Sequence, residues 1–141
     1  MSELRRDPIM GRWNIIETEG PVGPEAFEVA EHSLSGGRCP FCAGNEGMTP
    51  PEIYAVRPAA GAPNGTDWQL RVVANKFPAL KIEGDLDRRG IGVFDYCNGV
   101  GAHEVIIETP DHRRQMSDLS LEELSNVVTA FKARSLDLRG D

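Results

Sequence analysis

Residues 103–138 read HEVIIETPDHRRQMSDLSLEELSNVVTAFKARSLDL and hold the clearest strand and the clearest helix of the chain. The first seven residues are rich in β-branched side chains and end before Pro110, which predicts a strand over 103–109. Ser120 and Glu123 form a capping box, which predicts a helix from residue 121 to about residues 134–138. Five apolar residues at helical spacing are expected to face a sheet: Leu121, Leu124, Val127, Val128 and Phe131.

Shorter strand patterns precede this stretch at residues 13–16, 53–56, 68–73 and 91–96. The turn residues over 58–67 predict that the second and third of these strands form a hairpin. Four glycines and two prolines predict a loop over 19–38. Because the strands come first and one helix packs against them late, we expect an α+β domain with a mostly antiparallel sheet.

The length and composition are those of one globular domain. The 141 residues are 40% hydrophobic and carry a formal net charge of −7, and a chain of this length can bury a substantial core. No apolar run is long enough for a membrane span or a signal peptide, so we expect a cytoplasmic protein without a membrane partner. The acidic balance argues against a protein that coats nucleic acids.

The three cysteines are Cys39, Cys42 and Cys97, an odd number that does not suit a disulfide framework. The pair in Cys39-Pro40-Phe41-Cys42 has three alternative interpretations: it holds a metal, it forms a redox dithiol, or it is buried and has no function. We favour zinc, because a Cys-x-x-Cys turn presents two sulfurs to one ion. A redox dithiol needs a helix start at the motif, and the Gly44–Gly47 segment that follows is a poor one. Cys97 is expected to be a buried free thiol.

Three histidines could supply a third zinc ligand. His112 follows the predicted strand 103–109 on a turn, and His103 opens that strand, so the spacing does not decide between them. His32 lies in the Gly-rich stretch, where solvent exposure is expected. The sequence identifies no fourth ligand within these residues.

Five motifs occur together in a recognisable order. They are DPIMGRW at 7–13, CPFCAGNE at 39–46, TPPE at 49–52, RVVANKFPAL at 71–80 and GAHEVIIETPDH at 101–112. With them, the chain resembles the N-terminal part of the galactose-1-phosphate uridylyltransferases, a branch of the histidine-triad superfamily, over nearly all of its 141 residues. The resemblance implies that residues 1–141 form a histidine-triad-like, zinc-bearing domain that is incomplete at its C-terminal end.

The resemblance also implies an activity and a set of site residues. The family transfers a uridylyl group between hexose 1-phosphates through a covalent nucleotidyl-histidine, and its members are commonly homodimers. Nucleotide sugars and hexose 1-phosphates are therefore the expected partners. The implied zinc ligands are Cys39, Cys42 and His112, which favours His112 over His103. Four residues match positions that line the uridine and ribose pocket: Phe41, Val73, Asn75 and Phe77. The alternative to a role in nucleotide binding is that Phe41, Val73 and Phe77 are core residues.

Two departures from the family pattern limit these expectations. No His-x-His occurs in the sequence, whereas the family carries a catalytic His-Pro-His-x-Gln segment after the last helix. We therefore expect no catalytic residue within these residues and no activity from them alone. Gly20 and Gly23 stand where many members have phosphate-binding arginines, so a relative that uses an adenine nucleotide, such as an adenylyl-transferring phosphorylase, remains open. A non-catalytic zinc- or nucleotide-binding module is the remaining alternative.

Overall fold

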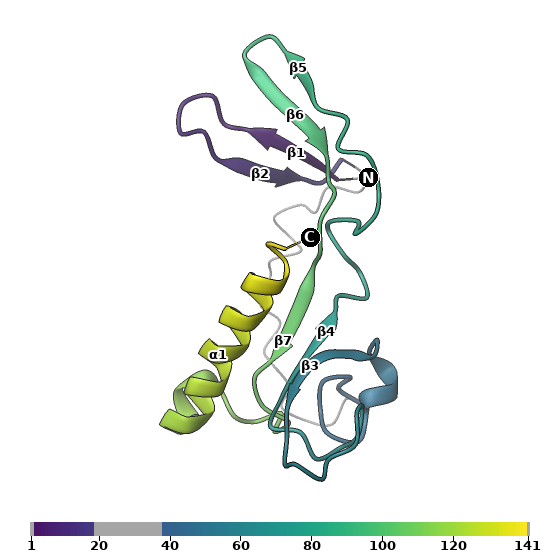
Figure 1. Ribbon diagram of the computed structural model, residues 1–141, viewed down its shortest axis with the longest axis vertical. Helices are drawn as coiled ribbons and strands as arrows, with labels where there is room; N and C mark the ends of the chain where they lie inside the picture. Colours follow the sequence, from purple (N-terminus) through teal and green to yellow (C-terminus); the bar gives the residue numbers. More distant parts are fainter. Residues whose placement is uncertain (1, 19–37, 141) are drawn as a thin grey trace. The chain divides into compact units, whose positions relative to one another are not determined.

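The computed structural model describes residues 2–18 and 38–140, and these form two compact units (Figure 1). We call residues 2–18 with 77–103 the hairpin unit, and residues 38–76 with 104–140 the knuckle unit. The loop predicted over 19–38 lies outside the described residues except for Arg38, as do Gly20, Gly23 and His32. Among the described residues, no helix has the length and apolar character needed to cross a lipid bilayer.

The hairpin unit is a four-stranded antiparallel sheet with the order β2-β1-β6-β5. Its strands are β1 (Glu3–Arg6), β2 (Trp13–Ile16), β5 (Arg89–Ile91) and β6 (Phe94–Asn98). Strand β1, whose only apolar residue is Leu4, is not predicted by the sequence pattern, because it depends on pairing with neighbours on both sides. The strand predicted over 91–96 is a hairpin that turns at Gly92, which adopts a positive φ of 59°.

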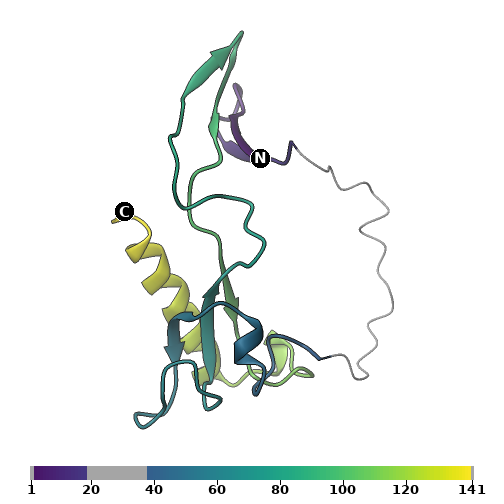
Figure 2. The same cartoon turned by 90° about the vertical axis from the view of Figure 1, so that its right-hand side faces the viewer.

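The knuckle unit contains a three-stranded antiparallel sheet, one α-helix and two short 3₁₀ turns. The strands β3 (Glu52–Val56), β4 (Leu70–Ala74) and β7 (Glu104–Ile107) lie in the order β3-β4-β7. The 3₁₀ turns are η2 (Glu46–Met48) and η3 (Met116–Asp118), and α1 (Leu121–Asp137) lies alongside the sheet (Figures 1 and 2). The predicted α+β class, with mostly antiparallel sheets and a C-terminal helix, is confirmed.

The central strand β4 is buried on both of its faces. Leu70 and Val72 pack with Val127 and Ala130 of α1, whereas Val73 packs with Trp68 and Ile107 on the opposite face. This division follows from the alternation of side chains along a strand. The helix therefore covers one face of the sheet, and the other face is free to support the cysteine-bearing segment.

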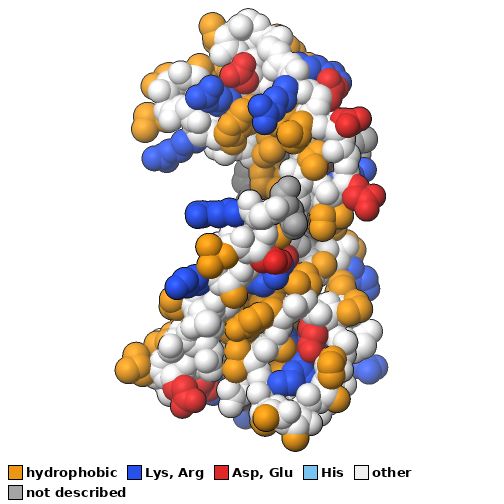
Figure 3. Space-filling view, viewed as in Figure 1, with side chains coloured by type: hydrophobic (Ala, Val, Ile, Leu, Met, Phe, Trp, Pro, Cys, Tyr) orange, Lys and Arg blue, Asp and Glu red, His pale blue; other side chains and the backbone are white. Residues whose placement is uncertain are grey.

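The helix begins as predicted but is rotated from the predicted orientation. The Ser120 hydroxyl accepts the Glu123 N–H, and the Glu123 carboxylate accepts the Ser120 N–H, so the capping box is confirmed. Leu121, Val128 and Phe131 are, however, 84%, 67% and 52% exposed, so the prediction that they face the sheet is wrong. Figure 3 shows apolar side chains left on the surface along this helix.

Two side chains account for this orientation of the helix. Ala130 is fully buried and, being small, allows α1 to approach the sheet closely. One turn further along, Arg134 donates to both carboxylate oxygens of Glu104 on β7, each at 2.7 Å. A bidentate pair of this kind fixes direction as well as distance, and it turns the Leu124–Val127–Ala130 side of the helix inward.

The adjacent residues Val127 and Val128 provide a matched test of this orientation. Val127→Ala should lower the free energy of unfolding by about 2 kcal/mol, because a buried side chain loses contacts and leaves a cavity. Val128→Ala should change it by less than about 0.5 kcal/mol, because the side chain is exposed. Urea unfolding followed by circular dichroism measures both, and equal destabilisation by the two changes would contradict the observed packing.

Candidate metal centre

The two cysteines of the CPFC motif lie on a tight turn of the knuckle unit. The Cys42 N–H donates to the Cys39 carbonyl oxygen at 3.3 Å, and the Asn45 N–H donates to the Cys42 carbonyl at 3.1 Å. The side-chain amide of Asn45 also donates to the Cys39 carbonyl at 2.8 Å. These bonds close the turn on itself, so that both half-buried thiols belong to one small, hydrogen-bonded loop.

His112 lies on a second turn, which begins directly after β7. The Asp111 N–H donates to the Thr109 hydroxyl at 3.2 Å, and the Asp111 carboxylate accepts the Arg113 N–H at 3.0 Å. Such side chain-to-backbone bonds are typical of Asp and Thr in turns. They hold the backbone on both sides of His112, whose own side chain is exposed.

An ion pair fastens this second turn to the start of α1. Arg114 donates to both carboxylate oxygens of Glu123, at 2.6 and 2.8 Å. The hydrogen bond from Arg114, followed by those from Ser120, lowers the pKa of the Glu123 carboxyl to about 2. The carboxylate is therefore ionised throughout the range in which proteins normally work, and the link is present there.

The structure brings Cys39, Cys42 and His112 together. Their ligand atoms all lie within 4.8 Å of one another. A tetrahedral zinc ion, with bonds of about 2.3 Å to sulfur and about 2.0 Å to nitrogen, would hold such atoms roughly 3.5–3.8 Å apart. The donor set therefore fits zinc in chemistry, and it needs only a small contraction to fit in size.

His103 lies in the hairpin unit rather than in the knuckle unit. Its Nδ1 accepts the Ala79 N–H at 3.0 Å, so one of its two ring nitrogens is occupied by the backbone. The spacing alone left His103 and His112 as equal candidates, and only His112 lies in the compact unit that contains the cysteine pair.

The surroundings of Cys42 shift the pKa of its thiol. Burial raises the pKa of the Cys42 thiol, and the hydrogen bond and charge of Cys39 raise it further. A reactive redox cysteine has a lowered pKa, because the thiolate is the nucleophile. A raised pKa gives no support to a redox dithiol, but a zinc ligand is a thiolate as well. It is the cluster of both thiols with His112 that favours a metal-binding pair, which would release protons when the ion binds.

The four residues matched to a nucleotide pocket differ in exposure. Val73 is 1% exposed within the sheet, which agrees with the core alternative, whereas Phe41 is 43% exposed beside the cysteines. Asn75 is half-buried just after β4. Phe77 belongs to the hairpin unit and is 83% exposed, so it is not a core residue. The part that these side chains play in nucleotide binding stays a prediction.

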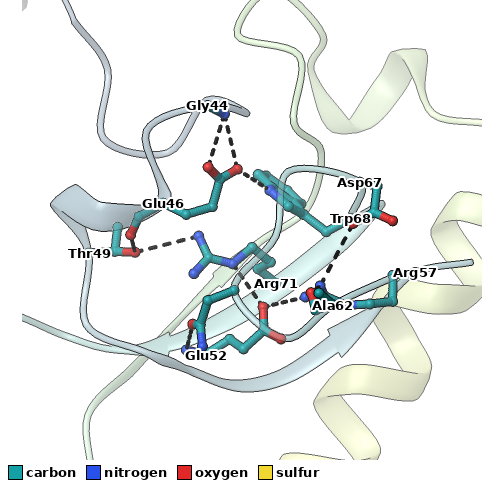
Figure 4. A network of polar contacts seen from close by, with 10 residues as sticks. Gly44, Glu46, Thr49, Glu52, Arg57, Ala62, Asp67, Trp68 and Arg71 are labelled. Atoms are coloured by element: carbon teal, nitrogen blue, oxygen red, sulfur yellow. Dashed lines mark hydrogen bonds and ion pairs between the residues drawn. The ribbon is translucent and has the colours of Figure 1, made fainter. Parts of the chain in front are cut away.

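A buried polar network beside the knuckle was missed by the sequence analysis (Figure 4). Glu46 and Arg71 are only 9% and 1% exposed. Glu46 accepts a hydrogen bond from the Trp68 indole at 2.8 Å, and Arg71 donates to Glu52 at 3.2 Å and to Thr49 at 3.5 Å. The available signal was an acidic residue four positions after Cys42 and a basic residue inside an apolar strand, since each needs a partner when it is buried.

The matches to known proteins extend over nearly the whole chain. No protein-family model matches the sequence. The chain is nevertheless homologous to the galactose-1-phosphate uridylyltransferase family over most of its length, and it corresponds to the N-terminal part of these relatives. It spans little more than a third of the length of the curated relatives that it matches.

Two curated relatives and one solved structure illustrate the similarity. The chain is 31% identical to the ADP-glucose phosphorylase of Arabidopsis thaliana over 137 residues, which cover 94% of this chain and 38% of that protein. It is 26% identical to the galactose-1-phosphate uridylyltransferase of Thermotoga maritima over 142 residues, or 98% and 36% of the two proteins. The crystal structure of an A. thaliana ADP-glucose phosphorylase with bound ADP-glucose matches all of this chain and 39% of its own, with 28% identity and a TM-score of 0.56.

Replacing the ligands tests the metal centre. Cys39→Ser and His112→Ala should each weaken zinc binding by at least about tenfold and lower the thermal stability of the zinc-loaded protein, because each removes one of three ligands. Metal content and competition with a chelator measure the affinity. His103→Ala is the matched control and should leave the affinity unchanged, so an equal loss in that variant would contradict the assignment.

Proposed function

We propose that this chain is the zinc-bearing, nucleotide-binding part of an enzyme that transfers the nucleotidyl group of a nucleotide sugar. The cluster of Cys39, Cys42 and His112, on a chain homologous to the uridylyltransferase family, is the observation that carries the proposal. In this reading, residues 1–141 form a histidine-triad-like domain.

The proposed zinc has a structural role. When bound, it would supply a crosslink between the CPFC turn and the turn after β7, which are separated by about seventy residues of sequence. The residues of the chain perform the remaining tasks. Asn45 and Glu46 hold the first turn, and Arg114 holds the second through Glu123.

Asn75 and Phe41 are the proposed contacts to the nucleotide within the knuckle unit. An asparagine amide can both donate to and accept from the hydroxyl groups of a ribose. An exposed aromatic ring such as that of Phe41 offers an apolar face to a base. In the hairpin unit, the exposed ring of Phe77 offers the same chemistry, and Val73 supports β4 from within the core.

We do not assign a nucleophile to any of the 141 residues. Nucleotidyl transfer through a covalent intermediate needs a histidine that attacks the α-phosphorus, together with donors that stabilise the charged phosphoryl oxygens. The sequence contains no His-x-His pattern that could supply both. We therefore propose that these residues alone bind metal and nucleotide without catalysing the transfer.

A phosphorylase that acts on an ADP-sugar is the form of this activity that we favour. The identity to an ADP-glucose phosphorylase is 31%, against 26% to a galactose-1-phosphate uridylyltransferase. Gly20 and Gly23 also stand where many uridylyltransferases carry arginines. Uridylyl transfer between hexose 1-phosphates in galactose metabolism is the second candidate, supported by the resemblance of the five motifs.

The resemblance also supports a homodimer that works on nucleotide sugars and sugar phosphates. Sedimentation of the zinc-loaded protein would measure its oligomeric state. A monomer at all protein concentrations would contradict the homodimer and would leave the metal centre and the nucleotide site unaffected.

Nucleotide binding can be measured on the 141-residue chain itself. By isothermal titration calorimetry, the zinc-loaded protein should bind ADP-glucose more tightly than UDP-glucose. Asn75→Ala should weaken binding about three- to tenfold, the equivalent of one lost hydrogen bond. Asn14→Ala, an exposed asparagine on β2 of the hairpin unit, is the control and should have no effect. Failure of the wild type to bind either nucleotide sugar would contradict the proposal.

The transfer step needs the full product of the gene. If its reading frame contains a His-Pro-His segment, incubation with ADP-glucose should produce a covalent adenylyl adduct that intact-mass spectrometry detects. A uridylyl adduct from UDP-glucose would instead support the second candidate. If such a segment is present and neither adduct forms, a non-catalytic zinc- or nucleotide-binding module becomes the better interpretation.

A further inference from the structure

We infer that Glu46, held by the Trp68 indole, is a positioning residue for the candidate metal centre and fixes the CPFC turn in the shape that the ion requires. The inference deepens the proposed function and rests on it, because it assumes that Cys39 and Cys42 are zinc ligands. Glu46 would act through the backbone of the turn and would not touch the metal itself.

Glu46 contacts the backbone of the CPFC turn where the turn ends. Both carboxylate oxygens of Glu46 lie 3.0 Å from the backbone nitrogen of Gly44, which donates its N–H to them (Figure 4). Gly44 is the second residue after Cys42 and has a φ of +90°, a conformation that glycine adopts readily. The carboxylate therefore holds the chain where it leaves the second cysteine.

Glu46 is itself held by a buried tryptophan, Trp68. The Trp68 indole N–H donates to the same carboxylate at 2.8 Å, and Trp68 is 3% exposed. The Arg71 guanidinium lies 5.7 Å from the centre of the Trp68 ring. Because Trp68 also packs against Val73 of β4, the side chain that holds Glu46 is itself held by the core of the sheet.

The charge of Arg71 also acts on Glu46. Arg71 is buried and donates to Glu52, yet its Nη2 atom has no hydrogen-bond partner among the described residues. Glu52 offsets its positive charge, Thr49 accepts a further hydrogen bond, and Glu46 supplies a second negative charge nearby. Burial raises the pKa of the Glu46 carboxyl, but the hydrogen bonds from Trp68 and the backbone and the charge of Arg71 outweigh burial and lower it. Glu46 is thus held as a buried carboxylate, and burying this charge would be costly in free energy without these partners.

The consequence is a turn whose shape is set before the ion arrives. Glu46 holds the exit of the turn at Gly44, and Asn45 holds the carbonyl of Cys39 at its start. A site that is already shaped for its ligand binds more tightly, because less conformational freedom is lost on binding. Groups that orient metal ligands from outside typically contribute about ten- to a hundredfold to the affinity.

The decisive experiment compares Glu46→Gln with Glu104→Gln in the 141-residue chain. Both changes remove the charge of a poorly exposed carboxylate that accepts hydrogen bonds within the knuckle unit, but Glu104 pairs with Arg134 of α1 and not with the CPFC turn. Both should therefore lower the stability of the metal-free protein. Glu46→Gln alone should weaken zinc binding, by about tenfold, whereas Glu104→Gln should change it by less than about twofold.

Trp68→Phe gives a second, independent variant. It keeps an aromatic ring beside Arg71 and removes the N–H that holds Glu46, so it should also weaken zinc binding. If both residues act through this one hydrogen bond, the double variant should bind zinc about as weakly as Glu46→Gln alone. Zinc affinity from chelator competition is the readout, with urea unfolding of the metal-free proteins measured in parallel.

The outcomes separate the inference from the proposed function. Equal zinc affinities in Glu46→Gln and Glu104→Gln, with normal binding by the wild type, would overturn the role of Glu46 and leave the metal centre intact. Failure of the wild type to bind zinc would overturn the metal centre and the inference with it. A loss confined to Glu46→Gln and Trp68→Phe, and not additive between them, would support the inference.

Discussion

The burial of strand β4 on both faces is the constraint on which the knuckle unit depends. One face carries Leu70 and Val72 against α1, and the other carries Val73 against Trp68 and Ile107. Arg71 interrupts this apolar strand while being 1% exposed. A buried guanidinium needs charged or hydrogen-bonding partners, and these are Thr49, Glu52 and the Trp68 ring, from segments that follow the cysteine turn. The same strand therefore builds the core and anchors the candidate metal centre.

The candidate metal centre lies where two turns that are far apart in the sequence come together. Cys39 and Cys42 precede the sheet, and His112 follows its last strand, β7. Polar contacts hold both turns. The first is fastened through Glu46 to the sheet, and the second through Arg114 to the start of α1. A zinc ion would then complete an arrangement that hydrogen bonds and ion pairs already hold close to its final form.

Prediction succeeded where short-range chemistry decides the structure. The capping box of Ser120 and Glu123 and the β-branched run before Pro110 depend on residues a few positions apart, and both were located from the sequence. The failures share a different cause. The β1 strand needs two pairing partners. The rotation of α1 follows from buried Ala130 and from the ion pair between Arg134 and Glu104, two residues that lie 30 positions apart in the sequence. The sequence patterns suggested three candidate ligands, which the structure brings together, but gave no reason to single out Glu46 or Arg71.

The sequence by itself determined the α+β class, the start and extent of the helix and, through five ordered motifs, the family resemblance. It also predicted that the cysteine pair is a metal-binding motif. Only the tertiary structure decided which side of the helix is buried and that His112 shares a compact unit with the cysteines. It also decided that the Glu46 carboxylate, near the cysteine turn, is buried and accepts a hydrogen bond from Trp68. The physical reason is that caps, turns and alternation are set by neighbouring residues, whereas burial and charge compensation are set by segments that meet only when the chain folds.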